Sequence, residues 1–215
     1  MNTKRIFTWG AFILIIGLII WGMIAAANKA ERESAGMAPV DAVTATDWVK
    51  GNASSTVTLI EYSDFQCPAC GAYFPLIEDF YSKNSTSFKF VYRHFPLTQH
   101  ANAIPAAKAS EAAGKQGKFW EMHSKLFSNQ DSWATSTDAK AVFEGYAKDL
   151  GLDIEKYNAD LELPEVMTKI DSDQKSGIKA GVNSTPTFYL NGKKVSPQNY
   201  DQLKKLIDEA TSTNS

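Results

Sequence analysis

Two cysteines, Cys67 and Cys70, are the only ones in this chain of 215 residues, and Pro68 and Ala69 separate them. A thiol attacks a disulfide only as the thiolate, so a catalytic cysteine needs a lowered pKa. The start of a helix lowers the pKa of a thiol through unpaired N–H groups and the positive end of the helix dipole. Cys67 lies between a predicted strand and a predicted helix, so we assign it as the exposed nucleophile. Cys70 follows one turn later, close enough to form a disulfide with Cys67 and to resolve a mixed disulfide.

Other residues around the pair fit the same chemistry. Pro68 and Ala69 form the active-site loop, and Pro68 in the first helical turn stiffens it without the loss of a needed hydrogen bond. Glu61 lies on the preceding strand, six residues before Cys67. If Glu61 is buried beneath the cysteines, its pKa is raised and it can relay a proton to or from Cys70. If it is a solvated strand residue, it has no such role.

Other uses of a cysteine pair fit the sequence less well. A structural disulfide that closes so small a loop would stabilise the chain little. A zinc site needs about four ligands, and beyond the cysteines only His94, His100 and His123 add imidazoles. Covalent haem attachment needs a histidine directly after the second cysteine, where this chain has Gly71. We therefore predict no metal and no cofactor other than the redox-active Cys67–Cys70 disulfide itself.

Length and charge limit the class of protein. A chain of this length builds a well-packed domain without the help of crosslinks. There are 22 Lys and Arg residues against 24 Asp and Glu residues, and no basic stripe runs along the sequence. Without such a stripe, the chain has no electrostatic footprint for a nucleic-acid backbone. We therefore predict no nucleic-acid partner.

The N-terminal segment predicts an anchor in a membrane. Residues 6–27 carry no charge, and Trp9 and Trp21 lie where a membrane interface holds aromatic rings. A helix of this length crosses a hydrocarbon core about 30 Å thick. Lys4 and Arg5 precede the segment and keep the short N-terminal tail inside, so residues 1–27 are predicted to be a cytoplasmic tail and a single transmembrane helix. The rest of the chain is then expected outside the cytoplasm.

A cleaved secretory signal is the competing interpretation of the same segment. The small residues around Ala25–Ala27 would suit a signal peptidase. The apolar stretch is longer than the roughly 7 to 15 residues usual for a signal peptide, which favours the anchor. Both interpretations export the domain that follows.

The remaining pattern predicts a linker followed by one α/β domain. Residues 28–52 mix charge, Ala, Gly and Pro without a period, as a linker does. Residues 53–211 are predicted to fold, with residues 212–215 as a tail. The expected strands are residues 57–62, 88–94, 187–190 and 193–195. A helix is expected from Pro68, and a helical block is expected at residues 101–127, 137–151 and 163–181. The last helix is expected to be capped by Ser196, with Pro197 at its first position.

This order resembles the thioredoxin fold, and within it the DsbA-like thiol–disulfide oxidoreductases. The match covers roughly residues 46–210 and rests on several motifs in register. Glu61 stands where this fold keeps a buried acid, and Cys67-Pro68-Ala69-Cys70 fills the active-site position. The stretch GVNSTPTFYLNG, residues 181–192, is similar to the loop that carries the family's cis-proline, here Pro186. The resemblance implies an α/β thioredoxin fold with an inserted helical subdomain at about residues 99–181, and a substrate-binding wall formed by Thr185 and Pro186.

The resemblance also implies a function. We expect an extracytoplasmic oxidoreductase, single-pass in the cell membrane, that exchanges disulfides with exported proteins, most readily as a disulfide donor. A membrane redox partner would reset the cysteine pair. The sequence departs from strongly oxidising family members at Ala69, where they have a histidine that helps to hold the thiolate. A reductant of extracytoplasmic disulfides therefore remains as an alternative. A thioredoxin-fold copper metallochaperone is a second alternative, because thiols are soft ligands that suit copper.

Overall fold

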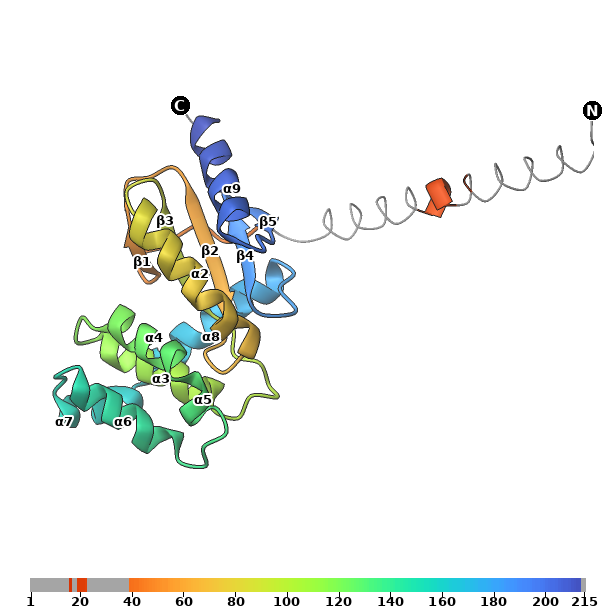
Figure 1. Cartoon of the computed structure of the whole chain (residues 1–215). Helices are drawn as coiled ribbons and strands as arrows, with labels where there is room; N and C mark the ends of the chain where they lie inside the picture. Colours follow the sequence, from red (N-terminus) through yellow and green to blue (C-terminus); the bar gives the residue numbers. More distant parts are fainter. Residues whose placement is uncertain (1–15, 17–18, 23–38, 214–215) are drawn as a thin grey trace, which may run out of the picture. The chain divides into compact units, whose positions relative to one another are not determined.

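The computed structural model describes Ile16, residues 19–22 and residues 39–213 (Figure 1). The chain divides into a unit of residues 1–38 and a unit of residues 39–215. The described residues of the first unit are helical. Apart from them, the predicted membrane-spanning segment, residues 6–27, lies outside the described residues. Within the part that is described, no helix has both the length and the apolar character to span a membrane.

The second unit is built on a five-stranded sheet. Its order is β1 (Trp48–Gly51), β3 (Lys89–His94), β2 (Thr58–Ser63), β4 (Thr187–Leu190) and β5 (Lys193–Val195). β2 and β3 pair in parallel and the other neighbours pair antiparallel. Five of the six residues of β2, and five of the six of β3, are buried. Continuous burial of this kind is typical of central strands that are covered on both faces.

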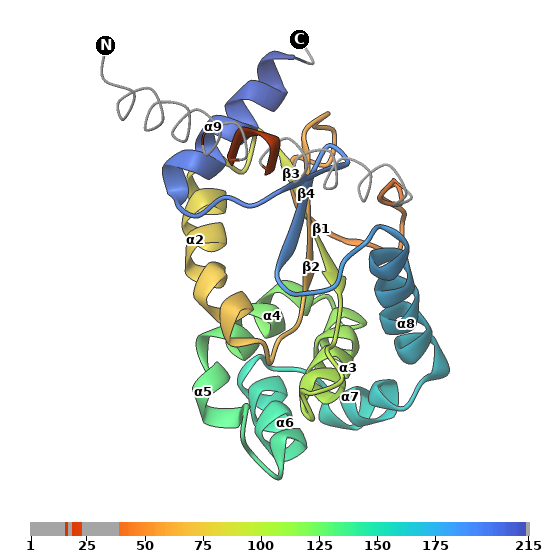
Figure 2. The ribbon, with the colours of Figure 1, turned by 90° about the vertical axis from the view of Figure 1, so that its right-hand side faces the viewer.

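Helices cover both faces of the sheet, as Figure 2 shows edge-on. One face carries α2 (Pro68–Asn84) and α9 (Tyr200–Ser212), and the other carries α8 (Pro164–Lys179). α8 approaches the sheet closely at Gly177, where a Cβ atom would lie 2.7 Å from the Phe95 ring. Between β3 and α8 the chain forms a helical insert at one end of the sheet, made of α3 (Ala103–Gly114), α4 (Phe119–Ser128), α5 (Gln130–Trp133), α6 (Ala139–Asp149) and α7 (Ile154–Leu161).

The predicted linker, residues 28–52, ends too late. β1 lies within it, and Arg93 on β3 forms a two-pronged ion pair with Asp47, at 2.8 and 2.9 Å. Trp48 stacks on Phe119 at a centroid distance of 4.3 Å. The partners of this segment lie more than 40 residues away in the chain, so local composition could not reveal that it packs.

Two helix boundaries also differ from the prediction. The last helix begins at Tyr200 rather than at Pro197, because the Asn199 side chain, not Ser196, caps it by accepting from the Gln202 N–H at 3.0 Å. The predicted helical stretch 101–127 is two helices, separated by a turn in which Gly117 has a φ of +75°. The insert is found within the predicted residues 99–181, but it ends with α7 at Leu161, because α8 packs on a face of the sheet. The hairpin turn is confirmed, with φ of +47° at Asn191 and +82° at Gly192.

Candidate active site

Cys67 occupies the N-terminal cap position of α2, directly after β2 and a short loop. Its backbone is extended, with φ −69° and ψ 121°, and Pro68 is the first helical residue. No side chain caps the helix within this described segment, so N–H groups of the first turn remain available to the Cys67 sulfur. The Cys67 residue is 7% exposed and Cys70 is 1% exposed. Both are free thiols in this structure, and both are buried. The prediction that Cys67 is exposed is therefore wrong, because the surrounding loops cover it, although Cys67 is the more accessible of the two.

The two thiols have opposite pKa shifts. The pKa of Cys67 is lowered to about 5, mainly by a hydrogen bond from the Cys70 thiol, and further by the Thr185 side chain and the N–H groups of Cys70 and Ala69; burial opposes this shift. The pKa of Cys70 is raised well above its ordinary value, first by burial and then by Cys67 and the charge of Glu61. Cys67 is thus the sulfur that carries charge near neutral pH. Ala69 contributes its backbone N–H, for which no particular side chain is required.

The loop before β4 forms the wall beside Cys67. β4 pairs with β2 so that Thr187 lies opposite Tyr62, and this register brings Thr185, two residues earlier, to the Cys67 sulfur. The Thr185–Pro186 bond is cis, as predicted. In the thiol form Cys67 donates from Sγ to the Thr185 carbonyl at 3.4 Å. The Thr185 hydroxyl is buried and, among the described residues, has no partner in this form. Once Cys67 is ionised, that hydroxyl can donate to the thiolate, which explains its effect on the Cys67 pKa.

Glu61 is buried behind the cysteines, as the register with the first cysteine predicted. It is 5% exposed, and Ser63 Oγ donates to Glu61 Oε1 at 2.7 Å. Burial raises the pKa of Glu61 to about 7, which Ser63 and the charge of Lys50 partly offset. A carboxyl group with this pKa can hold or release a proton near neutral pH. This is the property that a relay to Cys70 needs.

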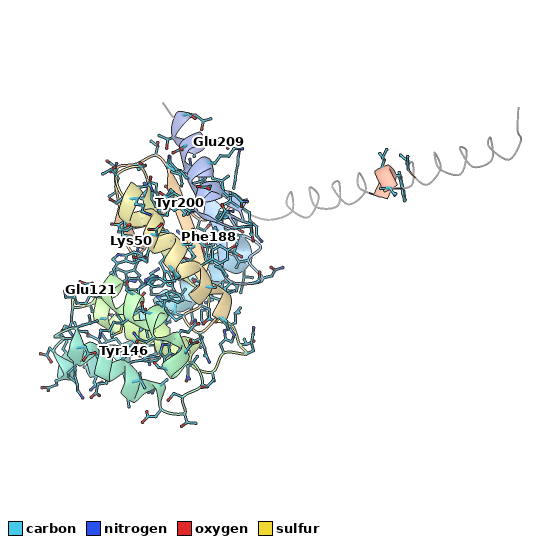
Figure 3. The ribbon with its side chains drawn as sticks, viewed as in Figure 1. Lys50, Glu121, Tyr146, Phe188, Tyr200 and Glu209 are labelled. Carbon is cyan, nitrogen blue, oxygen red and sulfur yellow. The ribbon has the colours of Figure 1, made fainter. Side chains whose placement is uncertain are left out.

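Lys50 belongs to the same buried region and was missed from the sequence. It projects from edge strand β1 between the sheet, α2 and the insert (Figure 3). Its Nζ forms an ion pair with Glu78 and lies 4.5 Å from the Tyr81 ring centroid and 4.7 Å from that of Trp120. Burial lowers the pKa of Lys50 despite the ion pair. No sequence signal could identify it, because Lys50 falls in the segment predicted to be a linker.

The three histidines have different partners. His94 bonds Glu111 at 2.8 Å, His100 bonds Asp64 at 2.6 Å, and His123 is enclosed by aromatic rings. Within residues 39–213 no three or more Cys, His, Asp or Glu side chains gather where they could share a metal ion. Asp64, which also accepts from the N–H groups of Gln66 and Leu97, holds the loop before Cys67.

Comparison with known proteins gives matches over the same region. A family model described as Thioredoxin matches residues 43–209. A thioredoxin-like oxidoreductase from Silicibacter pomeroyi DSS-3 is 28% identical, with a TM-score of 0.68, over 79% of this chain and 94% of that one. Oxidised BdbD from Bacillus subtilis is 25% identical, with a TM-score of 0.68, over 82% of this chain and 98% of that one. Wolbachia pipientis alpha-DsbA1, at 22% identity and a TM-score of 0.69, covers 80% of this chain and 94% of its own and shows likeness of fold alone. These matches support the expected DsbA-like thioredoxin fold.

Curated relatives match a domain-sized part of much longer proteins. The Na⁺/H⁺ antiporter NhaA 1 of Mycolicibacterium gilvum is 36% identical over 151 residues, which is 69% of this chain and 24% of the antiporter. The corresponding antiporter of Salinispora arenicola is 38% identical over 159 residues, 74% of this chain and 23% of the antiporter. The chain spans about a quarter of the length of these relatives.

We expect Thr185→Val to raise the pKa of Cys67. The substitution removes the hydroxyl but keeps the shape and the carbonyl group. A hydrogen bond to a charged group contributes about 1.5 to 3 kcal/mol, so the pKa should rise by about one unit or more. The measurement is a pH titration of thiolate ultraviolet absorbance in the reduced protein. Thr168→Val, which removes an exposed hydroxyl bonded to the Pro164 carbonyl on α8, is the control. An unchanged Cys67 pKa in Thr185→Val would contradict this role of the hydroxyl.

Glu61→Gln should change how stability depends on pH. Because the folded-state pKa of Glu61 is about 7 against an ordinary 4.5, the folded protein keeps a proton that the unfolded chain loses between these values. The free energy of unfolding contributed by Glu61 therefore falls as pH rises from about 4.5 to about 7, by up to roughly 3 kcal/mol. Glutamine stays neutral and removes this slope. The test is denaturant unfolding of the reduced wild-type and Glu61→Gln proteins across this pH range. Both proteins retain Cys67, so its titration contributes to both stability curves. Parallel stability curves would show that Glu61 ionises normally in the folded state.

Proposed function

The chain belongs to the thioredoxin family, and from this premise we propose that it is a thiol–disulfide oxidoreductase acting through Cys67 and Cys70. The observation that carries the proposal is the division of labour between the two sulfurs. One thiol at the helix N-terminus has a pKa of about 5, and its buried neighbour has a raised pKa. The DsbA-type oxidoreductases among the similar structures support a role in disulfide exchange.

The exchange follows from this geometry. In the oxidised protein a substrate thiolate attacks Sγ of Cys67, the more accessible sulfur; a substrate–Cys67 disulfide forms and the Cys67–Cys70 bond breaks. The electron pair of the broken bond goes to Cys70, which takes up a proton because of its raised pKa. A second substrate thiolate then attacks the substrate sulfur of the mixed disulfide and releases Cys67 as a thiolate. The substrate gains one disulfide, and two electrons remain on the cysteine pair.

The low pKa of Cys67 supports a disulfide donor. Stabilisation of the thiolate favours the reduced form of the pair and so makes the oxidised form a better oxidant. Here the stabilising groups are the Cys70 thiol, the Thr185 side chain and backbone N–H groups, so Ala69 in place of a histidine does not prevent the shift. A copper carrier would need both sulfurs as thiolate ligands, which the raised pKa of Cys70 opposes.

Glu61 is proposed as the proton relay of Cys70, and Thr185 and Pro186 as the substrate-facing wall. Glu61 has a pKa near 7 and acts on the Cys70 pKa through its charge, so it can supply or accept a proton as Cys70 changes state. An extended substrate segment would pair with the backbone at Thr185 as an added strand. If Glu61 is the relay, Glu61→Gln should slow resolution by Cys70 without altering the first attack of Cys67 on a disulfide.

Single serine substitutions should separate the two sulfurs. Cys67→Ser should abolish exchange, because it removes the accessible nucleophile. Cys70→Ser should trap a mixed disulfide when it meets a disulfide-bonded substrate, because the Cys67 thiolate attacks the substrate disulfide and no Cys70 thiol is present to break the new bond. Oxidation of a reduced, unfolded ribonuclease by the oxidised protein measures exchange, and gel analysis of adducts with a scrambled, disulfide-bonded ribonuclease measures trapping. Cys67→Ser/Cys70→Ser is the blank in both.

Two further measurements decide the assignment and the direction of exchange. If alkylation at mildly acidic pH labels Cys70 before Cys67, the roles of the two sulfurs are reversed. Equilibration with glutathione gives the reduction potential of the pair. A potential as low as that of cytosolic thioredoxins, about −270 mV, would make the protein a reductant instead of a donor.

The location of the domain is part of the proposal. We place it outside the cytoplasm, anchored through residues 6–27, where it would act on exported proteins and be reset by a membrane redox partner. The uncharged segment behind Lys4 and Arg5 supports this topology. The full chain should therefore remain with the membrane fraction, and its domain should become accessible to protease once any outer barrier is removed. Recovery of a soluble form that begins near Asn28 or Glu31 would contradict the anchor.

A further inference from the structure

A side chain of the helical insert holds the active-site loop directly. Gln130, the first residue of α5, donates from Nε2 to the carbonyl of Phe65 at 2.7 Å and to the carbonyl of Cys67 at 2.9 Å. The donor lies 63 residues away in the chain from Cys67. One amide group thus ties together the residues on both sides of Gln66, at the point where the loop turns into α2.

The position of Gln130 is itself fixed by the insert. α5 has only four residues, and its last residue, Trp133, is fully buried and donates from Nε1 to the Leu126 carbonyl at 2.9 Å. The next residue, Ala134, accepts at its carbonyl from Gln66 Nε2 at 2.6 Å. Asn102 closes the network, because its N–H donates to Gln66 Oε1 at 2.6 Å. The loop before Cys67 is therefore hydrogen-bonded to both ends of α5, at Gln130 and at Ala134 directly after the helix.

Gly71 leaves the space that the Gln130 amide occupies. A Cβ atom on Gly71 would lie 2.5 Å from Gln130 Oε1, nearer than atoms of this kind approach in folded proteins. Gly71 is in the first turns of α2, where alanine would be the better helix former. The backbone of Gly71 is not in the left-handed region. The helix itself does not require a glycine at position 71. The Gln130 amide does, because it fills the space that a Cβ atom would occupy.

We propose that Gln130 is a positioning residue of the thiol–disulfide site, and that one role of the insert is to supply it. The proposal rests on the function proposed above. The two N–H bonds of the amide cover the negative ends of the Phe65 and Cys67 carbonyls, and they fix the loop so that the N–H groups of Ala69 and Cys70 face the Cys67 sulfur. Gln130 touches neither sulfur nor substrate, and it acts through the backbone of Cys67.

The test replaces the amide by a side chain of similar length. Gln130→Met keeps most of the packing but removes both donors. In the reduced full-length protein we expect the pKa of Cys67 to rise, and the equilibrium with glutathione to shift about threefold to tenfold toward the Cys67–Cys70 disulfide, the range that loss of a hydrogen bond produces. Gln116→Met is the matched control. Gln116 also bridges two segments of the insert, through the backbone of Asp153, but does not contact the active-site loop.

A double-mutant cycle with Gly71 separates positioning from general stability. Gly71→Ala should displace the amide and raise the pKa of Cys67, although alanine favours the helix. In a Gln130→Ala background the new Cβ meets no amide, so Gly71→Ala should cause no further rise. A Cys67 pKa and a glutathione equilibrium that are unchanged in Gln130→Met, or additive effects of Gly71→Ala and Gln130→Ala, would overturn the proposal.

These readouts need no protein substrate. A wild-type protein that fails to oxidise ribonuclease would contradict the proposed function, while the titration of Cys67 would still report on Gln130. Loss of the folded state in Gln130→Met, seen by circular dichroism, would make Gln130 a structural residue and would also overturn its assignment as a positioning residue.

Discussion

The negative charge of the Cys67 thiolate has to be held at the end of α2 in a site where the residue is only 7% exposed. Water cannot solvate it fully there, and burial alone would raise its pKa. The charge is held because short-range donors converge on one sulfur: the Cys70 thiol, the Thr185 side chain and the first N–H groups of the helix. The Thr185 side chain comes from the loop before β4, and the other donors come from Ala69 and Cys70 in the first turn of α2. Their convergence therefore depends on the register of β2 with β4 and on the extended backbone at the start of α2.

Burial also sets the pKa of the two other ionisable groups near the site, the Glu61 carboxyl and the Cys70 thiol. Glu61 and Cys70 have few compensating donors, and burial raises the pKa of both. Their charges also oppose one another, because a charged Glu61 makes ionisation of Cys70 harder. One buried region thus contains a sulfur that is anionic at neutral pH, a thiol that keeps its proton and a carboxyl group that titrates near neutral pH. The difference arises from the hydrogen-bond donors around Cys67 together with the deeper burial of Glu61 and Cys70.

Local patterns in the sequence were sufficient for the parts of the fold whose causes are local. The apolar run of β2 followed by a helix with proline at its first position placed Cys67, and the Asn191–Gly192 pair placed the hairpin. The cis bond at Pro186 and the burial of Glu61 came from the resemblance, since neither residue carries a local signal. β1 was missed, because its four residues gain their packing from Arg93 and Phe119. Asn199 in place of Ser196 as the helix cap was missed because both residue types suit that position.

Gln130 shows why the remaining part of the site could not be derived from the sequence. A glutamine on a four-residue helix has no periodic or compositional signal, and its two acceptors are backbone carbonyls, which any residue type would offer. The sequence does record the contact indirectly, as a glycine in a helix at position 71. In the sequence alone, this glycine excludes only haem attachment. The structural reason for Gly71 becomes clear only when the atoms that fill the space beside it are known. The fold places those atoms there, because it brings α5 of the insert against the loop that precedes Cys67.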